Sequence, residues 1–389
     1  MTIKHIGLLN IQRCDSHGAV LLAYAMEHFL LEEGYAVNTI DYKYAGRIVE
    51  NNVLKKLINK LLIKWKKQLH MSYANKTVCG ESVKSEYDIQ HSHFEEFRKN
   101  LLTLTKEVTN VNDQIVNSFD AIVVGSDVVW KPEIARCIDR ELYFLRSPKK
   151  EIRKVAYAAS IGTNDAEFLE KYEECYENAF DCLDFISVRE KSSVSFIRKF
   201  TDKQVDVVID PVFLLDKSEY MKIEKKTDYK VKGSYVYVYI LGTNEKAIKL
   251  ANDFAAKNGL SIVLDINESF ELSNLITVPC QSAISAGPQE FLYNLRNASY
   301  VMTDSFHATA FSIIYNKPFW VFKRGKISVR MSDLINTFSL GGRMVSDTLD
   351  DSNIDWVCVN QEILKRRKAG AKWLLNALDN HKEREAYGY

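Results

Sequence analysis

The stretch YVMTDSFHATAFSIIYNKPFWVF, residues 300–322, carries the strongest structural signal in the chain. It opens on an apolar run that indicates a buried strand, and the small polar residues 303–305 are typical of a helix start. Residues 306–315 then have helical spacing, and after Pro318 a second apolar run indicates the next strand. In strand–helix–strand units, polar groups at the carboxyl end of the strand face a ligand crevice. His307 lies at that point and is the histidine that we expect to take part in chemistry.

The same alternation of apolar runs and helical segments extends over most of the chain. Strands are predicted at residues 5–9, 36–40, 121–124, 154–159, 185–188, 205–209, 235–241, 261–266, 300–302 and 319–322. Helices are predicted at residues 19–32, 93–100, 167–182, 192–199, 245–258, 288–297, 306–315, 333–338 and 361–380. Strands that alternate with helices favour parallel sheets covered by helices. We therefore expect an α/β fold of two Rossmann-like domains that face a cleft.

Length and charge patterning predict two domains and a closing helix. A chain of 389 residues exceeds one ordinary hydrophobic core. The charged segment 216–233 has no clear element and is the predicted linker, so we expect domains at residues 1–215 and 230–350. The last long helix, within residues 351–389, is expected to pack back on the N-terminal domain. The turn after the first predicted strand has no G-x-G-x-x-G pattern, so a dinucleotide is not indicated.

Composition excludes several classes of protein. The 52 Lys and Arg residues nearly balance 51 Asp and Glu residues, leaving a net charge of +1, so no nucleic-acid partner is indicated. The seven cysteines include no CxxC pair, which favours free thiols in a reducing cytoplasm and no zinc site. We find neither a signal peptide nor an apolar stretch of the roughly 18–20 residues that span a bilayer. These features predict a cytoplasmic protein.

Residues 53–69, VLKKLINKLLIKWKKQL, predict a basic amphipathic helix. Apolar side chains recur every four residues from Val53 to Trp65, and lysines fill much of the remainder. Such a helix either meets anionic lipid at the inner face of the plasma membrane or covers the N-terminal sheet as an ordinary surface helix. The sequence leaves both interpretations open.

Several stretches, in a fixed order along the chain, together form a recognisable pattern. They are SHGAVLLAYAMEHFLLEEGYAVNTIDY (16–42), DAIVVGSDVVW (120–130), VAYAASIG (155–162) and GPQEFLYNLRNASYVMTDSFHATAFSIIYNKPF (287–319), with shorter echoes in SVRE (187–190) and DPVFLL (210–215). Together they resemble the polysaccharide pyruvyl transferase family. The Gly-Ser-Asp-x-x-Trp block and the Ser-Phe-His block are the most specific parts of this resemblance.

The resemblance implies a glycosyltransferase-B-like fold and transfer of the enolpyruvyl unit of phosphoenolpyruvate to two hydroxyls of one sugar. The product is a cyclic ketal on a bacterial capsule, exopolysaccharide or cell-wall glycan, and the acceptor is often a lipid-linked or nucleotide-linked precursor. No cofactor is implied beyond phosphoenolpyruvate as co-substrate. Better-studied members resemble Arg-Leu-His at the focal position, where the arginine contacts the donor. This chain has Ser305-Phe306-His307, so the cation must come from elsewhere.

Ketal formation needs a proton-transfer group with a pKa near neutrality, and binding of phosphate and carboxylate needs cations and N–H donors. The predicted catalytic residues are His307, as general acid or base, and Asp127, which would orient or deprotonate an acceptor hydroxyl. The predicted donor-binding residues are Ser305, Arg189, Lys323 and Arg324. The predicted acceptor-binding residues are Asn10, Ser16, His17, Gly18, Ser126 and Trp130.

Structural roles stay open for several of these residues. His307 could instead be a core histidine, and Trp130 a core residue. Asp127 and Ser126 could instead cap the next turn. His91 and His93 have no nearby acid cluster, so no metal is predicted. Two other functions also fit the fold: a glycosyltransferase with a nucleotide-sugar donor, and a non-catalytic glycan-binding protein.

Overall fold

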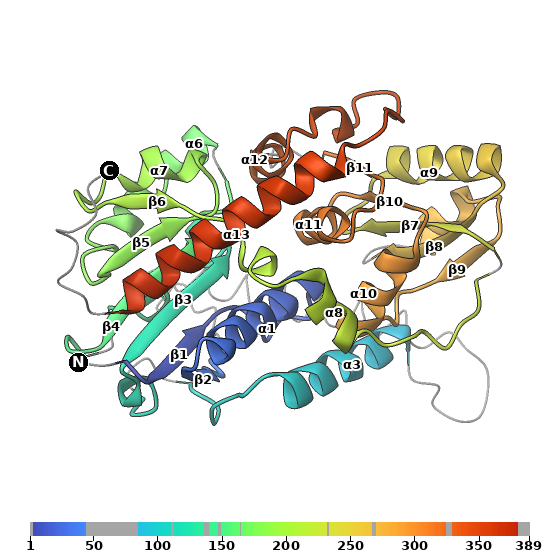
Figure 1. Ribbon diagram of the computed structural model, residues 1–389. Helices are drawn as coiled ribbons and strands as arrows, with labels where there is room; N and C mark the ends of the chain where they lie inside the picture. The colour runs from blue at the N-terminus through green and yellow to red at the C-terminus, as the bar shows by residue number, and fades with distance from the viewer. Residues whose placement is uncertain are drawn as a thin grey trace, which may run out of the picture.

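The computed structural model describes residues 3–43, 85–109, 113–135, 140–146, 149–163, 165–231, 233–266, 270–323 and 329–379. These residues form two parallel β-sheets with helices packed around them, which confirms the α/β prediction (Figure 1). The predicted helix at residues 53–69 and Arg324 lie outside the described residues. Within the described part, no helix is long and apolar enough to cross a membrane.

The N-terminal sheet has the strand order β2-β1-β3-β4-β5-β6, and every neighbouring pair is parallel. Its strands are β1 (His5–Leu9), β2 (Ala36–Thr39), β3 (Ala121–Asp127), β4 (Arg153–Ala159), β5 (Phe185–Val188) and β6 (Val205–Val207). Its helices are α1 (His17–Glu32), α3 (Glu86–Leu101), α4 (Pro132–Ala135), α5 (Arg140–Tyr143), α6 (Ala166–Glu170) and α7 (Ser192–Ile197), with short 3₁₀ turns η1 (Val116–Ser118), η2 (Glu173–Tyr176) and η3 (Pro211–Phe213). The strand order reverses between β1 and β3, and open α/β sheets bind ligands at such a reversal.

The C-terminal sheet has the order β11-β10-β7-β8-β9, again with parallel pairs. Its strands are β7 (Tyr235–Ile240), β8 (Ser261–Ile266), β9 (Cys280–Ser282), β10 (Tyr300–Thr303) and β11 (Phe319–Val321). Its helices are α8 (Lys217–Ile223), α9 (Glu245–Asn258), α10 (Pro288–Asn297), α11 (Phe306–Ile314), α12 (Val329–Thr337) and α13 (Trp356–Leu378), with η4 (Phe270–Leu275) and η5 (Gly341–Arg343). Here the order reverses between β7 and β10, so the residues after β10 lie at the second ligand-binding position.

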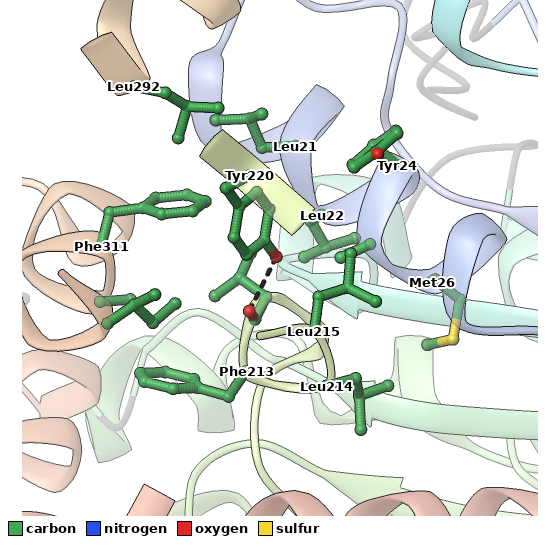
Figure 2. Packing of buried hydrophobic residues seen from close by; sticks show 14 of the residues in the cluster. Leu21, Leu22, Tyr24, Met26, Phe213, Leu214, Leu215, Tyr220, Leu292 and Phe311 are labelled. Atoms are coloured by element: carbon green, nitrogen blue, oxygen red, sulfur yellow. Dashed lines mark hydrogen bonds between the residues drawn. The ribbon is translucent and has the colours of Figure 1, made fainter. Parts of the chain in front are cut away.

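One hydrophobic core joins the two sheets through α1. The core includes Ile6 and Val123 of the N-terminal sheet together with Tyr237 and Val301 of the C-terminal sheet. Figure 2 shows part of it, with Leu21, Leu22, Tyr24 and Met26 of α1 near Phe213, Leu214, Leu215, Tyr220, Leu292 and Phe311. Because α1 is apolar on almost every face, it packs against helices of both domains and fixes their relative position.

Three predictions of local structure were wrong. The helix predicted at residues 167–182 is instead the short α6 followed by η2, and the left-handed φ of 56° at Asn178 prevents a helix from continuing past that residue. The predicted linker contains α8, whose N-terminus is capped by Asp216 and whose Tyr220 ring packs 4.9 Å from Phe311. Residues 280–282, for which no strand is predicted, form the short edge strand β9.

The C-terminal helix α13 (red in Figure 1) lies against the N-terminal sheet as well as α11. The Trp373 indole donates to Asp206 of β6 at 2.7 Å, and Arg367 donates to the carbonyl of Phe213 at 2.8 Å. At Gly370 the helix passes so close to β4 that a Cβ atom would lie 2.6 Å from the Tyr157 hydroxyl. The glycine therefore permits the close contact between α13 and the N-terminal sheet.

Replacing Gly370 with alanine is expected to lower the free energy of unfolding by about 1–3 kcal/mol, as overpacking does. This loss should exceed the gain of about 1 kcal/mol that alanine brings to a helix interior. Urea denaturation measures the difference, and Gly341→Ala is the matched control because no described atom lies within 4 Å of a Cβ at that position. Equal stabilities of the two variants would contradict the close contact.

Candidate functional site

His307 lies at the meeting point of the two domains, directly over the N-terminus of α1. It occupies the first turn of α11, after β10, and is only 8% exposed. A Cβ atom at Gly18, in the first turn of α1, would lie 2.0 Å from Nδ1 of His307 and 2.3 Å from its Cγ. The imidazole therefore rests on the backbone of the opposite domain, and only glycine leaves room for it. Gly18 is predicted to contact the acceptor, but in the structure its backbone packs directly against the His307 ring.

A buried carboxylate, Asp210, faces the other side of the imidazole. Its Oδ2 lies 3.8 Å from Nε2 of His307 and accepts hydrogen bonds from Arg189 at 2.7 Å and from Ser126 at 3.0 Å. No described residue makes a hydrogen bond with Nε2 of His307. Asp210 was not predicted as a site residue, although it follows a predicted strand and begins the DPVFLL stretch that belongs to the family resemblance. Ser126 is fully buried, so it orients this carboxylate instead of reaching a bound acceptor.

Arg189 is held by two carboxylates and one aromatic ring. Its guanidinium donates to Asp210 and, at 3.0 Å, to Glu190, and it lies 4.1 Å from the centre of the Phe306 ring. Burial alone would lower the pKa of Arg189, but Glu190 and Asp210 raise it above its ordinary value, so the side chain stays charged. Its Nη2 has no acceptor among the described residues. One donor of this buried cation is therefore available to a ligand.

Asp127 closes the site from the end of β3. Its backbone adopts a left-handed φ of 68°, which is uncommon for a residue with a side chain. Oδ1 lies 3.9 Å from the Arg330 guanidinium of α12. Burial alone would raise the pKa of Asp127, but the charges of His307, Arg189 and Arg330 bring it below the ordinary value. Asp127 is therefore ionised at neutral pH.

The pKa of His307 is lowered, chiefly by burial, which disfavours the imidazolium. Asp210 and Asp127 oppose this effect, while Arg189 and Arg330 add to it. The imidazole is consequently neutral at pH 7 and able to accept a proton. Once protonated, it is stabilised by the two carboxylates.

Replacing Asp210 with asparagine is expected to lower the pKa of His307 further, because Asp210 is the strongest group that favours the imidazolium. NMR titration of the histidine ring protons measures this shift, with the His307 signal assigned by its absence in His307→Gln. Asp15→Asn serves as the control, since Asp15 pairs with the exposed His91 at 2.6 Å. An unchanged His307 titration in Asp210→Asn would show that the two side chains are not coupled.

A cavity of about 590 Å³ adjoins this cluster. It lies between the ends of β5 and β6 on one side and α11, α12 and α13 on the other, and Arg189, Asp210, Phe306 and Arg330 line it. A larger cavity of about 740 Å³ lies between η2 and α7, entirely within the N-terminal domain and away from His307. We therefore assign the candidate site to the smaller cavity and the cluster beside it.

Two residues predicted to bind the acceptor are structural. Trp130 is fully buried, donates from its indole to the carbonyl of Tyr143 at 3.0 Å and stacks on Phe144, so it cannot stack on a sugar. His17 is 2% exposed and stacks between Phe94 and Phe291, with ring centres 5.0 and 4.7 Å away. Both predictions are corrected for the same reason: the side chain has no surface left for a ligand.

The remaining predicted site residues are spread around the cluster. Asn10 is 5% exposed and accepts from the Gln12 backbone, while Ser16 is part-exposed at the N-cap of α1. Ser305 caps α11 by accepting from the Ala308 backbone at 3.4 Å, so its hydroxyl is already engaged. Lys323 is exposed just after β11.

One cluster of a histidine and two carboxyl groups lies away from the site. His28 lies 3.3 Å from Glu32 and 3.4 Å from Glu219, which is the one metal-like grouping within the described residues. Lys222 already contacts both oxygens of Glu219, at 2.8 and 2.6 Å.

Comparison with known proteins supports this reading of the fold. A family model described as polysaccharide pyruvyl transferase matches residues 17–325. UDP-GlcNAc 2-epimerase from Neisseria meningitidis, solved bound to UDP-GlcNAc, has a TM-score of 0.50 at 10% identity, covering 97% of this chain and 99% of its own. A putative UDP-N-acetylglucosamine 2-epimerase from Listeria monocytogenes has the same TM-score and identity, with 98% and 97% coverage. No curated protein sequence matches the chain. The likeness to these structures establishes a glycosyltransferase-B-like fold.

Proposed function

The chain belongs to the polysaccharide pyruvyl transferase family, and from that premise we propose that it forms a pyruvate ketal on a sugar of a bacterial surface polysaccharide or its precursor. Phosphoenolpyruvate is the proposed donor, and two hydroxyls of one sugar are the acceptor. The observation that carries the proposal is the buried His307, neutral at pH 7, with the carboxyl groups of Asp210 and Asp127 near it where the two domains meet. A proton-transfer group with carboxylates on either side suits a reaction that moves two protons.

The reaction balances without a further co-reactant. The first acceptor hydroxyl adds to C2 of phosphoenolpyruvate, and the methylene carbon gains a proton to become a methyl group. The C2–O bond to phosphate then breaks, and the second hydroxyl forms the second C2–O bond of the ketal. One hydroxyl proton ends on the methyl group, and the other leaves with inorganic phosphate.

His307 is the proposed carrier of the first proton. As a neutral base it accepts the proton of the attacking hydroxyl, and as an imidazolium it returns that proton to the methylene carbon. Asp210 and Asp127 stabilise the imidazolium between these steps, since both favour the charged form. Asp127 also orients the acceptor hydroxyl, and Arg189 offers its unpaired Nη2 to the donor.

The acceptor is proposed to enter from the N-terminal domain, past Asn10, Ser16 and Gly18. A lipid-linked or nucleotide-linked precursor is the proposed form of this acceptor, with the reaction in the cytoplasm. Contact with the inner face of the plasma membrane through residues 53–69 is part of the same proposal. The lysine-rich pattern of that segment supports it.

Glycosyl transfer from a nucleotide sugar is the competing function, and the described structure disfavours it at one point. Such enzymes commonly hold ribose with an acidic residue of the C-terminal domain, and Glu290, in the first turn of α10, is the residue to consider for that role. Glu290 is buried, accepts from the Gly287 backbone at 3.2 Å and lies 3.5 Å from Lys225, so it is occupied in capping α10. No contact among the residues that the structure describes favours a non-catalytic glycan-binding protein either.

Mass spectrometry separates these functions directly. The purified protein is incubated with candidate glycan precursors and either phosphoenolpyruvate or nucleotide sugars. Pyruvyl transfer predicts the mass gain of a pyruvate ketal and phosphate release with phosphoenolpyruvate alone. A glycosyl mass gain with a nucleotide sugar would replace this proposal with the competing one.

A further inference from the structure

We propose that the cavity of about 590 Å³ beside His307 binds the donor phosphate, and that Arg330 supplies the guanidinium which Ser305 does not. This inference rests on the proposed function, because it says where the phosphate of that donor is held. It concerns a residue of α12 that the sequence motifs do not mark.

The cavity has the size and lining of a site for a small anionic ester. Its volume falls within the range of about 300–1,000 Å³ that is usual for ligand pockets. Leu334 and Phe338 give it an apolar wall, and Lys191 and Arg330 bring positive charge to it. Such a lining suits a ligand with a charged phosphate and a small apolar enol group.

Ser305 and Arg189 are the other predicted donor-binding residues near the cavity, and neither brings a net positive charge to it. Ser305 is 5% exposed, and its hydroxyl accepts from the Ala308 backbone. The charge of Arg189 is offset by Asp210 at 2.7 Å and Glu190 at 3.0 Å. Arg189 nevertheless lines the cavity with a buried Nη2 that has no acceptor among the described residues. A phosphate oxygen is the acceptor that this N–H group would take.

Arg330 joins the cavity to the catalytic cluster. It lines the cavity, its side chain is 20% exposed, and its Nη1 lies 3.9 Å from Asp127. That separation is longer than a hydrogen bond and within the range of an ion pair. Its charge also acts on the pKa of His307, which shows that it lies within electrostatic range of the imidazole. A planar guanidinium binds phosphate through two parallel hydrogen bonds.

Three carboxylates line this cavity: Glu190 and Asp210 pair with Arg189, and Asp333 works against a bound anion. Asp333, one turn along α12 from Arg330, also lines it, and its Oδ2 has no hydrogen-bond partner among the described residues. Removal of this negative charge should therefore strengthen phosphate binding, whereas removal of the Arg330 charge should weaken it. The two opposite effects provide a signature that general damage to the fold would not produce.

The test is isothermal titration calorimetry of the full-length protein with phosphoenolpyruvate and, separately, with inorganic phosphate. Arg330→Met is expected to weaken binding of both about 10- to 100-fold, the range for a lost charge-assisted hydrogen-bond pair. Arg366→Met is the matched control, because Arg366 lines the same cavity but already pairs with Glu362 at 2.6 Å. Asp333→Asn is expected to tighten binding several-fold.

The outcomes separate this inference from the proposed function. Equal losses in Arg330→Met and Arg366→Met, or wild-type affinity in Arg330→Met, overturn the assignment to Arg330. Absence of binding of either probe by the wild-type protein overturns the phosphate site. If the wild type binds both probes through Arg330 but forms no ketal, the phosphate site stands and the pyruvyl transferase proposal fails. If Arg330→Met does not fold, Arg330→Lys takes its place. Lysine keeps the positive charge but lacks the paired N–H donors of the guanidinium, so it is expected to bind both probes with intermediate affinity.

Discussion

Replacing His307 with glutamine is expected to lower kcat of pyruvyl transfer by about a hundred- to ten-thousandfold, the usual contribution of a proton-transfer group. Glutamine keeps a polar group of similar reach over Gly18 but cannot accept or return a proton near neutral pH. The KM for phosphoenolpyruvate should change far less, since donor charge is met by Arg189 and Arg330 in our proposal. Initial rates of phosphate release with a productive acceptor give both constants.

The pH profile gives this prediction a second, independent readout. Because the pKa of His307 is lowered from its ordinary value of 6.5, neutral imidazole predominates at pH 7 and its base activity is lost as pH falls through the lowered pKa. The wild-type rate should therefore decline on the acid side below about pH 6.5. His307→Gln should lack that decline, and His91→Gln, with its exposed imidazole, should keep it. A His307→Gln enzyme with wild-type kcat would refute the catalytic assignment.

The second large effect is expected when Gly18 is replaced with alanine, which adds a methyl group beside His307. In Gly18→Ala the new methyl group would overlap the His307 ring, since its ideal position is 2.0 Å from Nδ1. The imidazole must move by an ångström or more, and misplacement of that size costs about a hundredfold in rate. We expect a loss of kcat of at least about this magnitude, measured by the same assay. Gly125→Ala is the control, because the nearest atom to its Cβ is the Leu9 carbonyl at 4.0 Å.

A double variant tests whether the clash is the cause. If alanine at position 18 destabilises the protein through His307, then Gly18→Ala combined with His307→Ala should recover thermal stability but not activity. A double variant as unstable as Gly18→Ala alone would instead locate the damage within α1. In that case the contact between His307 and Gly18 would not explain the loss.

The sequence predicted the strands and helices that carry the site better than it predicted the contacts between their side chains. Local patterns were sufficient to place His307 after a strand and at the start of a helix, because burial and capping leave a short-range periodic signal. The contact of His307 with Gly18 joins segments at opposite ends of the chain, and no periodicity records it. Asp210 was missed for the same reason: its contact with His307 forms only when the second domain is brought against it.

Aromatic residues within the motif stretches were the least reliable indication of which side chains contact the acceptor. Trp130 and His17 both belong to motif stretches that suggested acceptor contacts, yet each is surrounded by other rings. A sequence gives no means of deciding whether an aromatic ring beside a polar motif meets a ligand or the core. The charged segment 216–233 gave the opposite error. It was predicted to be a linker because it is polar, but its Tyr220 is fully buried and holds α8 against the core.

The role of α1 as a shared core element has a consequence for how the chain is made. On the ribosome, residues 17–32 emerge long before residues 288–314, which carry α10 and α11. At typical elongation rates of about 5–20 residues per second, that interval is on the order of ten to fifty seconds. During it, an almost wholly apolar helix has only part of its packing surface covered. Co-translational folding of this protein should therefore depend on chaperones that shield the nascent α1 until the second half of the chain arrives.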